Sequence, residues 1–138
     1  MRLSEGDARA RLTAARVATL ATIGDDGYPH LVPITFAVEG DLIYTAVDYK
    51  PKTTPKLRRL RNIEQNPRVA LLATHYSDDW EQLWWVRVDG QASVTAQAEE
   101  VQHPIDLLVR RYEQYSAHRP DGPVVTIRAD RWTGWSSS

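Results

Sequence analysis

The sequence has no cysteine, and it has only one methionine and one phenylalanine in 138 residues. Without cysteine there can be no disulfide and no thiolate metal site, which fits a reducing compartment, so we expect a cytoplasmic protein. No apolar run approaches the roughly 20 residues that a membrane helix needs, and the first residues lack the apolar core of a secretion signal. The length predicts one domain spanning residues 1–138.

Excess charge of one sign is also absent, because 17 basic and 18 acidic residues leave a net charge of −1. This balance argues against a general nucleic-acid or membrane binder. The basic residues are nevertheless unevenly spread: seven of the 17 fall between Lys50 and Arg68, where Glu64 is the only acid. A local patch of this kind indicates a small anionic ligand rather than a polyanion.

Apolar alternation and tight turns predict six strands, at residues 17–23, 28–38, 42–46, 68–76, 83–95 and 124–135. Helical patterns cover residues 8–15, after a Ser4 cap, a segment starting at Thr54–Pro55, and residues 99–115 with a break at Pro104. Strands joined by tight turns pair antiparallel. We therefore expect a mainly β (α+β) fold, a six-stranded antiparallel barrel with short flanking helices.

The start of the central helix is the first candidate binding site. Thr54 supplies an N-cap hydroxyl and Pro55 suits the first helical position, so free amides and a partial positive charge would favour phosphate there. The groups that would gather at this end are Lys50, Lys52, Thr53, Thr54, Lys56 and, one turn later, Arg59. The alternative is a solvated basic helix face without a ligand.

The aromatic strand from Trp84 to Asp89 is the second candidate. Alternation places Trp84, Val86 and Val88 on one face, and Trp85, Arg87 and Asp89 on the other. Trp85 and Arg87 suit a subunit interface, where both residue types are enriched, and the other possibility is a stacking wall for a cofactor ring.

No other catalytic or metal motif stands out. The four histidines have no metal-ligand spacing, and the chain has neither a GxSxG nor a GxGxxG motif. The candidate proton donors are Tyr44, Tyr49 and His75, and packing or loop roles compete with each. The catalytic residues stay unknown at this point.

Several runs, taken together, carry a resemblance to a known family. They are residues 18–22, 26–30, 32–36, 50–52, 60–69 and 86–92, including Asn62-Ile63 followed by Asn66-Pro67-Arg68-Val69. The chain resembles the pyridoxamine-5'-phosphate-oxidase-like split-barrel superfamily, and within it the small PPOX-class bacterial proteins grouped as coenzyme F420-dependent enzymes.

The resemblance implies a split β-barrel of the FMN-binding type and a homodimer with a cofactor in each groove between the barrels. Pro33, Ile34 and Thr35 would lie along the ring of the cofactor. The stretch from Lys50 to Arg59 would hold phosphate, and Trp85 and Arg87 would approach from the neighbouring chain.

The implied activity is hydride transfer between bound coenzyme F420, a deazaflavin, and a small unsaturated or carbonyl substrate. Three alternatives remain open: an FMN-dependent enzyme of the same fold, a flavin- or deazaflavin-binding protein without turnover, and a tetrapyrrole binder using His30 or His75. Nucleic acid and membranes are not expected partners.

Overall fold

The computed structural model describes residues 1–47 and 57–138. It contains one antiparallel sheet whose strands follow the order β2-β1-β5-β6-β7-β4-β3. The strands are β1 (Ala18–Ile23), β2 (Pro29–Ile34), β3 (Ala37–Glu39), β4 (Leu42–Ala46), β5 (Arg68–His75), β6 (Trp84–Thr95) and β7 (Val124–Ser136). The helices are α1 (Glu5–Ala14), α2 (Arg58–Gln65), the 3₁₀ turn η1 (Trp80–Gln82), α3 (Ala98–Arg111) and α4 (Gln114–Ala117).

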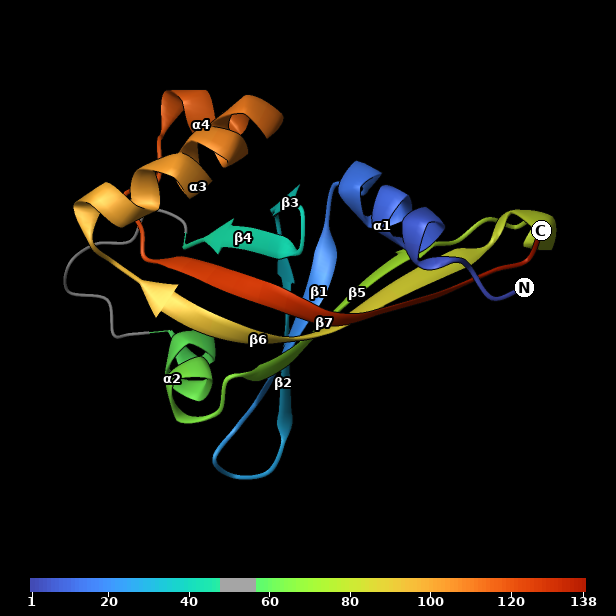
Figure 1. The fold of residues 1–138 in the computed structure, drawn as a ribbon, viewed down its shortest axis with the longest axis horizontal. Coiled ribbons are helices and arrows are strands. Elements are labelled where there is room, and N and C mark those ends of the chain that lie inside the picture. The colour runs from blue at the N-terminus through green and yellow to red at the C-terminus, as the bar shows by residue number, and fades with distance from the viewer. Residues whose placement is uncertain (48–56) are drawn as a thin grey trace.

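The long antiparallel pair of β6 and β7 lies in the middle of the sheet, between β5 and β4 (Figure 1). In this view α1 and α3 lie on one side of the pair and α2 lies on the other, and the two chain ends lie together at one end of it. No helix within the described ranges combines the length and the apolar character needed to cross a bilayer.

The expected mainly β fold with flanking helices is confirmed, but the number of strands is wrong. In the described residues there are seven strands instead of six, and the sheet stays open, with β2 and β3 at its edges. The segment expected to be one strand from Tyr28 to Val38 divides at Thr35 and Phe36.

The side chain of Tyr112, from the end of α3, explains this division. Its hydroxyl accepts a hydrogen bond from the Phe36 N–H at 3.1 Å and lies 3.0 Å from the Phe36 carbonyl oxygen. A tyrosine therefore satisfies the backbone of Phe36 where a neighbouring strand otherwise would, and the chain can turn from β2 into β3.

Thr54 and Pro55, where a helix start was predicted, lie outside the described residues, and α2 begins after them at Arg58. Leu57 is extended, and its carbonyl accepts the first hydrogen bonds of α2, from the amides of Leu60 at 3.1 Å and Arg61 at 3.3 Å. The N-terminus of α2 thus lies at 57–58, without a side-chain cap. Burial of Leu60 and Ile63 in the core stabilises α2 in place of a side-chain cap.

The break expected at Pro104 is absent, because α3 continues through it to Arg111. Val101, Ile105 and Leu108 form a fully buried stripe on this helix. Their burial outweighs the cost of about 3 kcal/mol for an internal proline.

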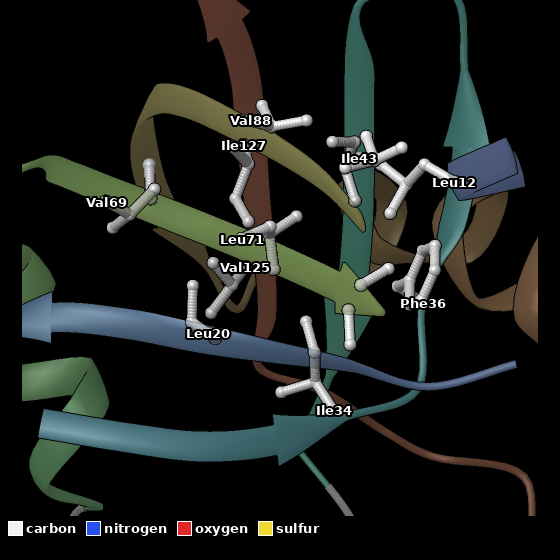
Figure 2. Close-up of a cluster of buried hydrophobic side chains, with 14 of the residues drawn as sticks. Leu12, Leu20, Ile34, Phe36, Ile43, Val69, Leu71, Val88, Val125 and Ile127 are labelled. Atoms are coloured by element: carbon white, nitrogen blue, oxygen red, sulfur yellow. The ribbon is translucent and has the colours of Figure 1, made fainter. Parts of the chain in front are cut away.

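Two apolar clusters hold the elements together. The larger lies between α1, α2 and the strands, and Figure 2 shows its centre, with Leu12, Leu20, Ile34, Phe36, Ile43, Val69, Leu71, Val88, Val125 and Ile127. The smaller lies under α3 and includes Tyr44, Ala46 and Tyr112. Ile43 and Tyr44 are neighbours in β4 and face different clusters, so β4 separates the two cores.

Candidate functional site

A cavity of about 520 Å³ opens where β2, β4 and α2 meet the junction of α3 and α4. Its walls are Arg16, Val17, Pro33, Ile34, Thr35, Thr45, Ala46, Arg59, Tyr112, Gln114 and Tyr115. This size lies within the range of about 300–1,000 Å³ that is usual for small-molecule sites. The walls combine apolar surface, hydroxyl groups and two guanidinium groups, so they can hold a ring and bind oxyanions.

Four of the predicted cofactor-binding residues line this one cavity. Pro33 and Ile34 end β2, Thr35 follows them, and Arg59 lies in the first turn of α2. The structure therefore brings together residues that are far apart in the sequence. Five further predicted residues lie outside the described ranges, namely Lys50, Lys52, Thr53, Thr54 and Lys56.

Reasoning from the sequence did not predict the other seven residues of the cavity wall, which are Arg16, Val17, Thr45, Ala46, Tyr112, Gln114 and Tyr115. Tyr112 and Tyr115 follow the apolar stripe of α3, and this spacing indicated only packing. Tyr112 is indeed buried, whereas Tyr115 is half-buried and its hydroxyl lies 2.7 Å from Thr35 Oγ1. The one feature of the sequence that could have indicated Tyr115 was its hydroxyl group on an otherwise apolar helix face.

Arg16 is held in place at the edge of the cavity. Its guanidinium carbon lies 4.5 Å from the centre of the Tyr112 ring, and Nη2 donates to the Arg111 carbonyl oxygen at 2.8 Å. A cation over an aromatic face is attracted to it, so this contact orients the planar group.

Of the candidate proton donors, the two in the described ranges, Tyr44 and His75, do not line this cavity. The Tyr44 hydroxyl donates to Glu39 Oε1 at 3.1 Å, and Tyr44 is not part of the cavity wall. Burial, together with the Glu39 carboxylate, raises the pKa of Tyr44. The His75 ring stacks on Trp84 with 6.0 Å between ring centres, away from the cavity, and Tyr49 lies outside the described residues.

Trp85 and Arg87 lie on a second surface, which we term the apolar sheet face. It is a shallow hollow of about 640 Å³ lined by Thr19, Ala21, Leu31, Ala70, Leu71, Leu72, Thr74, Trp85 and Arg87. Leu31 is 62% exposed, Leu72 42% and Trp85 38%. Exposed apolar surface of this kind is typical of interaction sites. Within one chain, these two residues do not join the cavity that holds Thr35.

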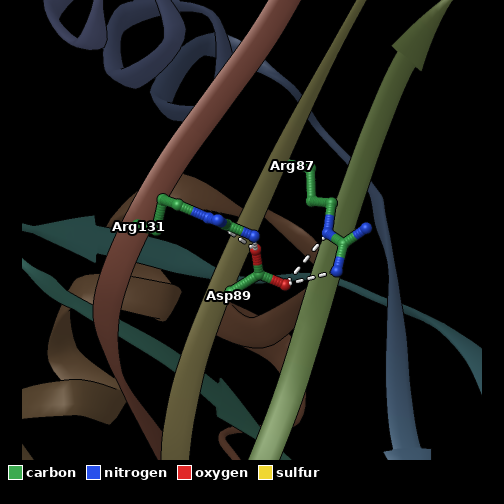
Figure 3. A network of polar contacts seen from close by, with 3 residues as sticks. All are labelled: Arg87, Asp89 and Arg131. Carbon is green, nitrogen blue, oxygen red and sulfur yellow. Dashed lines mark hydrogen bonds and ion pairs between the residues drawn. The ribbon is translucent and has the colours of Figure 1, made fainter.

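Asp89 links two arginines beside this face (Figure 3). Its Oδ1 accepts from Arg87 Nε at 2.9 Å and Nη2 at 2.6 Å, and its Oδ2 accepts from Arg131 Nη2 at 3.0 Å. Burial raises the pKa of Asp89, but hydrogen bonds from Arg87 and Arg131 outweigh it and bring the pKa below its ordinary value. The carboxylate therefore stays ionised and holds both guanidinium groups.

Histidine and carboxylate groups of the described ranges nowhere gather in threes that could hold a metal ion. His30 lies on β2 and is half-buried, and His75 lies at the end of β5. Neither residue lines the cavity described above.

Solved structures share this fold across nearly the whole chain. A conserved hypothetical protein from Mycobacterium tuberculosis is 25% identical with a TM-score of 0.76, covering 98% of this chain and 86% of that one. An FAD-binding protein from Mesorhizobium loti is 21% identical with a TM-score of 0.71, covering 97% and 93%. An FAD-binding protein from Mycobacterium smegmatis is 18% identical with a TM-score of 0.60, covering 97% and 94%.

Comparison with curated proteins gave no match. The sequence model of the family described as pyridoxamine 5'-phosphate oxidase, in contrast, matches residues 4–136. The match covers every strand and helix described above, and with them the residues of the cavity and of the apolar sheet face. The chain therefore belongs to the pyridoxamine 5'-phosphate oxidase family.

Proposed function

We propose that this protein is an oxidoreductase that binds coenzyme F420 and transfers a hydride between it and a small unsaturated or carbonyl substrate. The broader assignment, a flavin-related oxidoreductase family, rests on the family match and on the FAD-binding neighbours. The choice of the deazaflavin over a flavin is the proposal. A cytoplasmic location belongs to the same proposal.

The observation that carries this proposal is the cavity around Thr35. The end of β2 supplies the part of the wall from Pro33 to Thr35, and Arg59 supplies a cation. Thr45 and Ala46 precede residues 48–56, and Arg59 follows them, so the cavity adjoins both ends of the predicted phosphate-binding segment.

The residues present fit a phosphorylated ring cofactor. Pro33, Ile34 and Thr35 would lie along the ring, and Arg59 would bind a phosphate oxygen with its planar fork. When bound, the ring supplies the hydride chemistry, and the chain contributes position and electrostatics. Arg59 favours an anionic cofactor, since none of the described lining residues is acidic.

We further propose that the protein is a homodimer and that the apolar sheet face is buried between the two copies. Leu31, Leu72 and Trp85 expose apolar surface that a partner would cover. In this arrangement Trp85 and Arg87 reach the cofactor of the neighbouring chain, which accounts for their distance from the cavity of their own chain.

Titration of the purified protein with coenzyme F420 and with FMN tests the proposal, with fluorescence quenching as the readout. Tighter binding of coenzyme F420 and turnover with its reduced form are expected. Tighter binding of FMN identifies the FMN-dependent alternative. Binding without turnover on a panel of enones and carbonyl compounds identifies a cofactor-binding protein, and no binding of either cofactor contradicts the proposal.

A further inference from the structure

The positive charge of Arg16 at the cavity wall is not balanced by a carboxylate of the described part of the chain. The described lining residues include the guanidinium groups of Arg16 and Arg59 and no aspartate or glutamate. Arg16 forms no ion pair with any described carboxylate. In contrast to Arg16, Arg58 of α2 is paired with Asp26 at 2.9 Å.

The guanidinium of Arg16 is oriented before any ligand arrives. The Tyr112 ring lies 4.5 Å from its carbon, and Nη2 is engaged with the Arg111 carbonyl oxygen at 2.8 Å. Nε and Nη1 have no acceptor among the described residues. A fixed fork with free N–H groups at a cavity wall suits a carboxylate or phosphate, because little side-chain entropy is lost on binding.

A second arginine adds to the charge at this corner. The Arg111 guanidinium carbon lies 5.5 Å from the same Tyr112 ring and 5.1 Å from the Phe36 ring. Its Nε is buried without a hydrogen-bond partner, and it too lacks a described carboxylate. Two like charges flanking one ring repel each other, and an oxyanion bound at Arg16 would reduce that repulsion.

We infer that Arg16 forms an oxyanion subsite, with the hydroxyl groups of Thr35 and Tyr115 on the same wall. The molecule that shares the cavity with the redox cofactor therefore carries a carboxylate or phosphate group. The inference rests on the proposed function, since a substrate is implied only if a cofactor occupies the Arg59 side. It adds a substrate class, small anionic enones or carbonyl compounds, to that function.

The same oxyanion chemistry could come from the substrate or from the cofactor's own phosphate. FMN and riboflavin separate these sources, because they differ only in the phosphate. Benzoate and benzamide serve as the substrate-sized probes, because they match in shape and differ in charge. Two-dimensional NMR of the 15.7 kDa chain reports binding of all four through the amides around Val17, Phe36 and Tyr115.

For the unaltered protein, benzoate is expected to bind about tenfold more tightly than benzamide, with and without added cofactor. Arg16→Gln is expected to abolish this preference while the ratio of FMN to riboflavin affinity stays unchanged. Arg110→Gln is the matched control, because Arg110 is exposed on α3 and its loss removes the same charge nearby. It is expected to retain the preference.

Three results would overturn the inference. They are equal binding of benzoate and benzamide, a preference for benzoate that survives Arg16→Gln, or an Arg16→Gln variant that loses only the preference for FMN over riboflavin. Should Arg16→Gln fold poorly, Arg16→Lys keeps the charge and loses the fork, and several-fold weaker benzoate binding is expected. Unchanged benzoate binding in Arg16→Lys also counts against the inference. The cofactor titrations are a separate measurement, so a failure of the proposed function can be distinguished from a failure of this inference.

Discussion

The hydroxyl of Tyr112 accepts the backbone N–H of Phe36 at 3.1 Å, across a sequence separation of 76 residues. The same oxygen lies 3.0 Å from the carbonyl oxygens of Phe36 and Arg16. One side chain thus joins the β2–β3 corner to the entry of β1 and to the end of α3. These are three of the walls of the cavity, so the hydroxyl defines the shape of the candidate site.

Tyr112→Phe tests this role by deleting only the hydroxyl. The buried Phe36 N–H then has no acceptor, and the free energy of unfolding is expected to fall by about 1–3 kcal/mol. Urea denaturation measures this change. Tyr76→Phe is the control, because Tyr76 is 69% exposed and should stay within about 0.5 kcal/mol of the unaltered protein. Equal stability of the two variants would show that the corner does not depend on Tyr112.

Gly90→Ala tests the close approach of β6 and β7 at the irregularity between Asp89 and Gly90. A Cβ at Gly90 would lie 2.4 Å from the Arg128 carbonyl oxygen, which is backbone and cannot move away easily. A loss of about 1–3 kcal/mol of stability is expected. Gly6→Ala in α1 is the control, since its Cβ meets nothing closer than 4.0 Å. It should be neutral or stabilising by up to about 1 kcal/mol, and similar losses in both variants would refute the steric argument.

Local sequence patterns predicted the features that depend on neighbours along the chain. Alternation in β6 correctly assigned its faces, because Val86 and Val88 are buried whereas Trp85 and Arg87 are exposed. The Ser4 cap is also confirmed, since its Oγ accepts from the Asp7 amide at 3.1 Å. In both cases the deciding contacts lie within a few residues or repeat with the period of the strand.

The features that escaped prediction depend on contacts between distant residues. The strand break at Thr35 and Phe36 is caused by Tyr112, and the sequence of residues 28–38 does not predict it. The continuation of α3 through Pro104 depends on the burial of its apolar side chains against the sheet. Arg16 becomes a cavity residue only because α3 brings Tyr112 beneath its guanidinium.

The Asp89 carboxylate predicts a specific dependence of stability on pH. Arg87 and Arg131 hold its pKa in the folded state below the ordinary value of 3.8, despite partial burial. The unfolded chain therefore binds this proton at higher pH, so the stabilisation is complete above pH 3.8 and is lost as the pH falls through the folded pKa. Asp89→Asn should flatten the loss of stability in acid, measured by denaturation at a series of pH values.

Arg131→Gln supplies an intermediate case for the same experiment. It removes one of the two guanidinium groups on Asp89 and leaves the Arg87 hydrogen bonds in place. The pKa of Asp89, followed by NMR titration, is expected to rise toward its ordinary value. An unchanged pKa in this variant would contradict the network as the cause of the shift.

Leu72→Glu tests whether the apolar sheet face joins two copies of the chain. Leu72 is 42% exposed on β5 and lies among Thr74, Trp85 and Arg87 in the hollow of this face. A carboxylate there would have to be buried on association, which costs far more than the apolar contact contributes. Sedimentation velocity is expected to show a dimer for the unaltered protein and a monomer for this variant.

Arg110→Gln makes the same change in net charge on α3, outside this face, and should remain dimeric. Cofactor titration of both variants then separates two roles of the interface. If Trp85 and Arg87 act on the neighbouring chain, the Leu72→Glu monomer binds cofactor at least about tenfold more weakly, since part of each site leaves with the partner. A monomer that keeps full affinity would place the whole cofactor site within one chain, and a Leu72→Glu variant that stays dimeric would move the interface elsewhere.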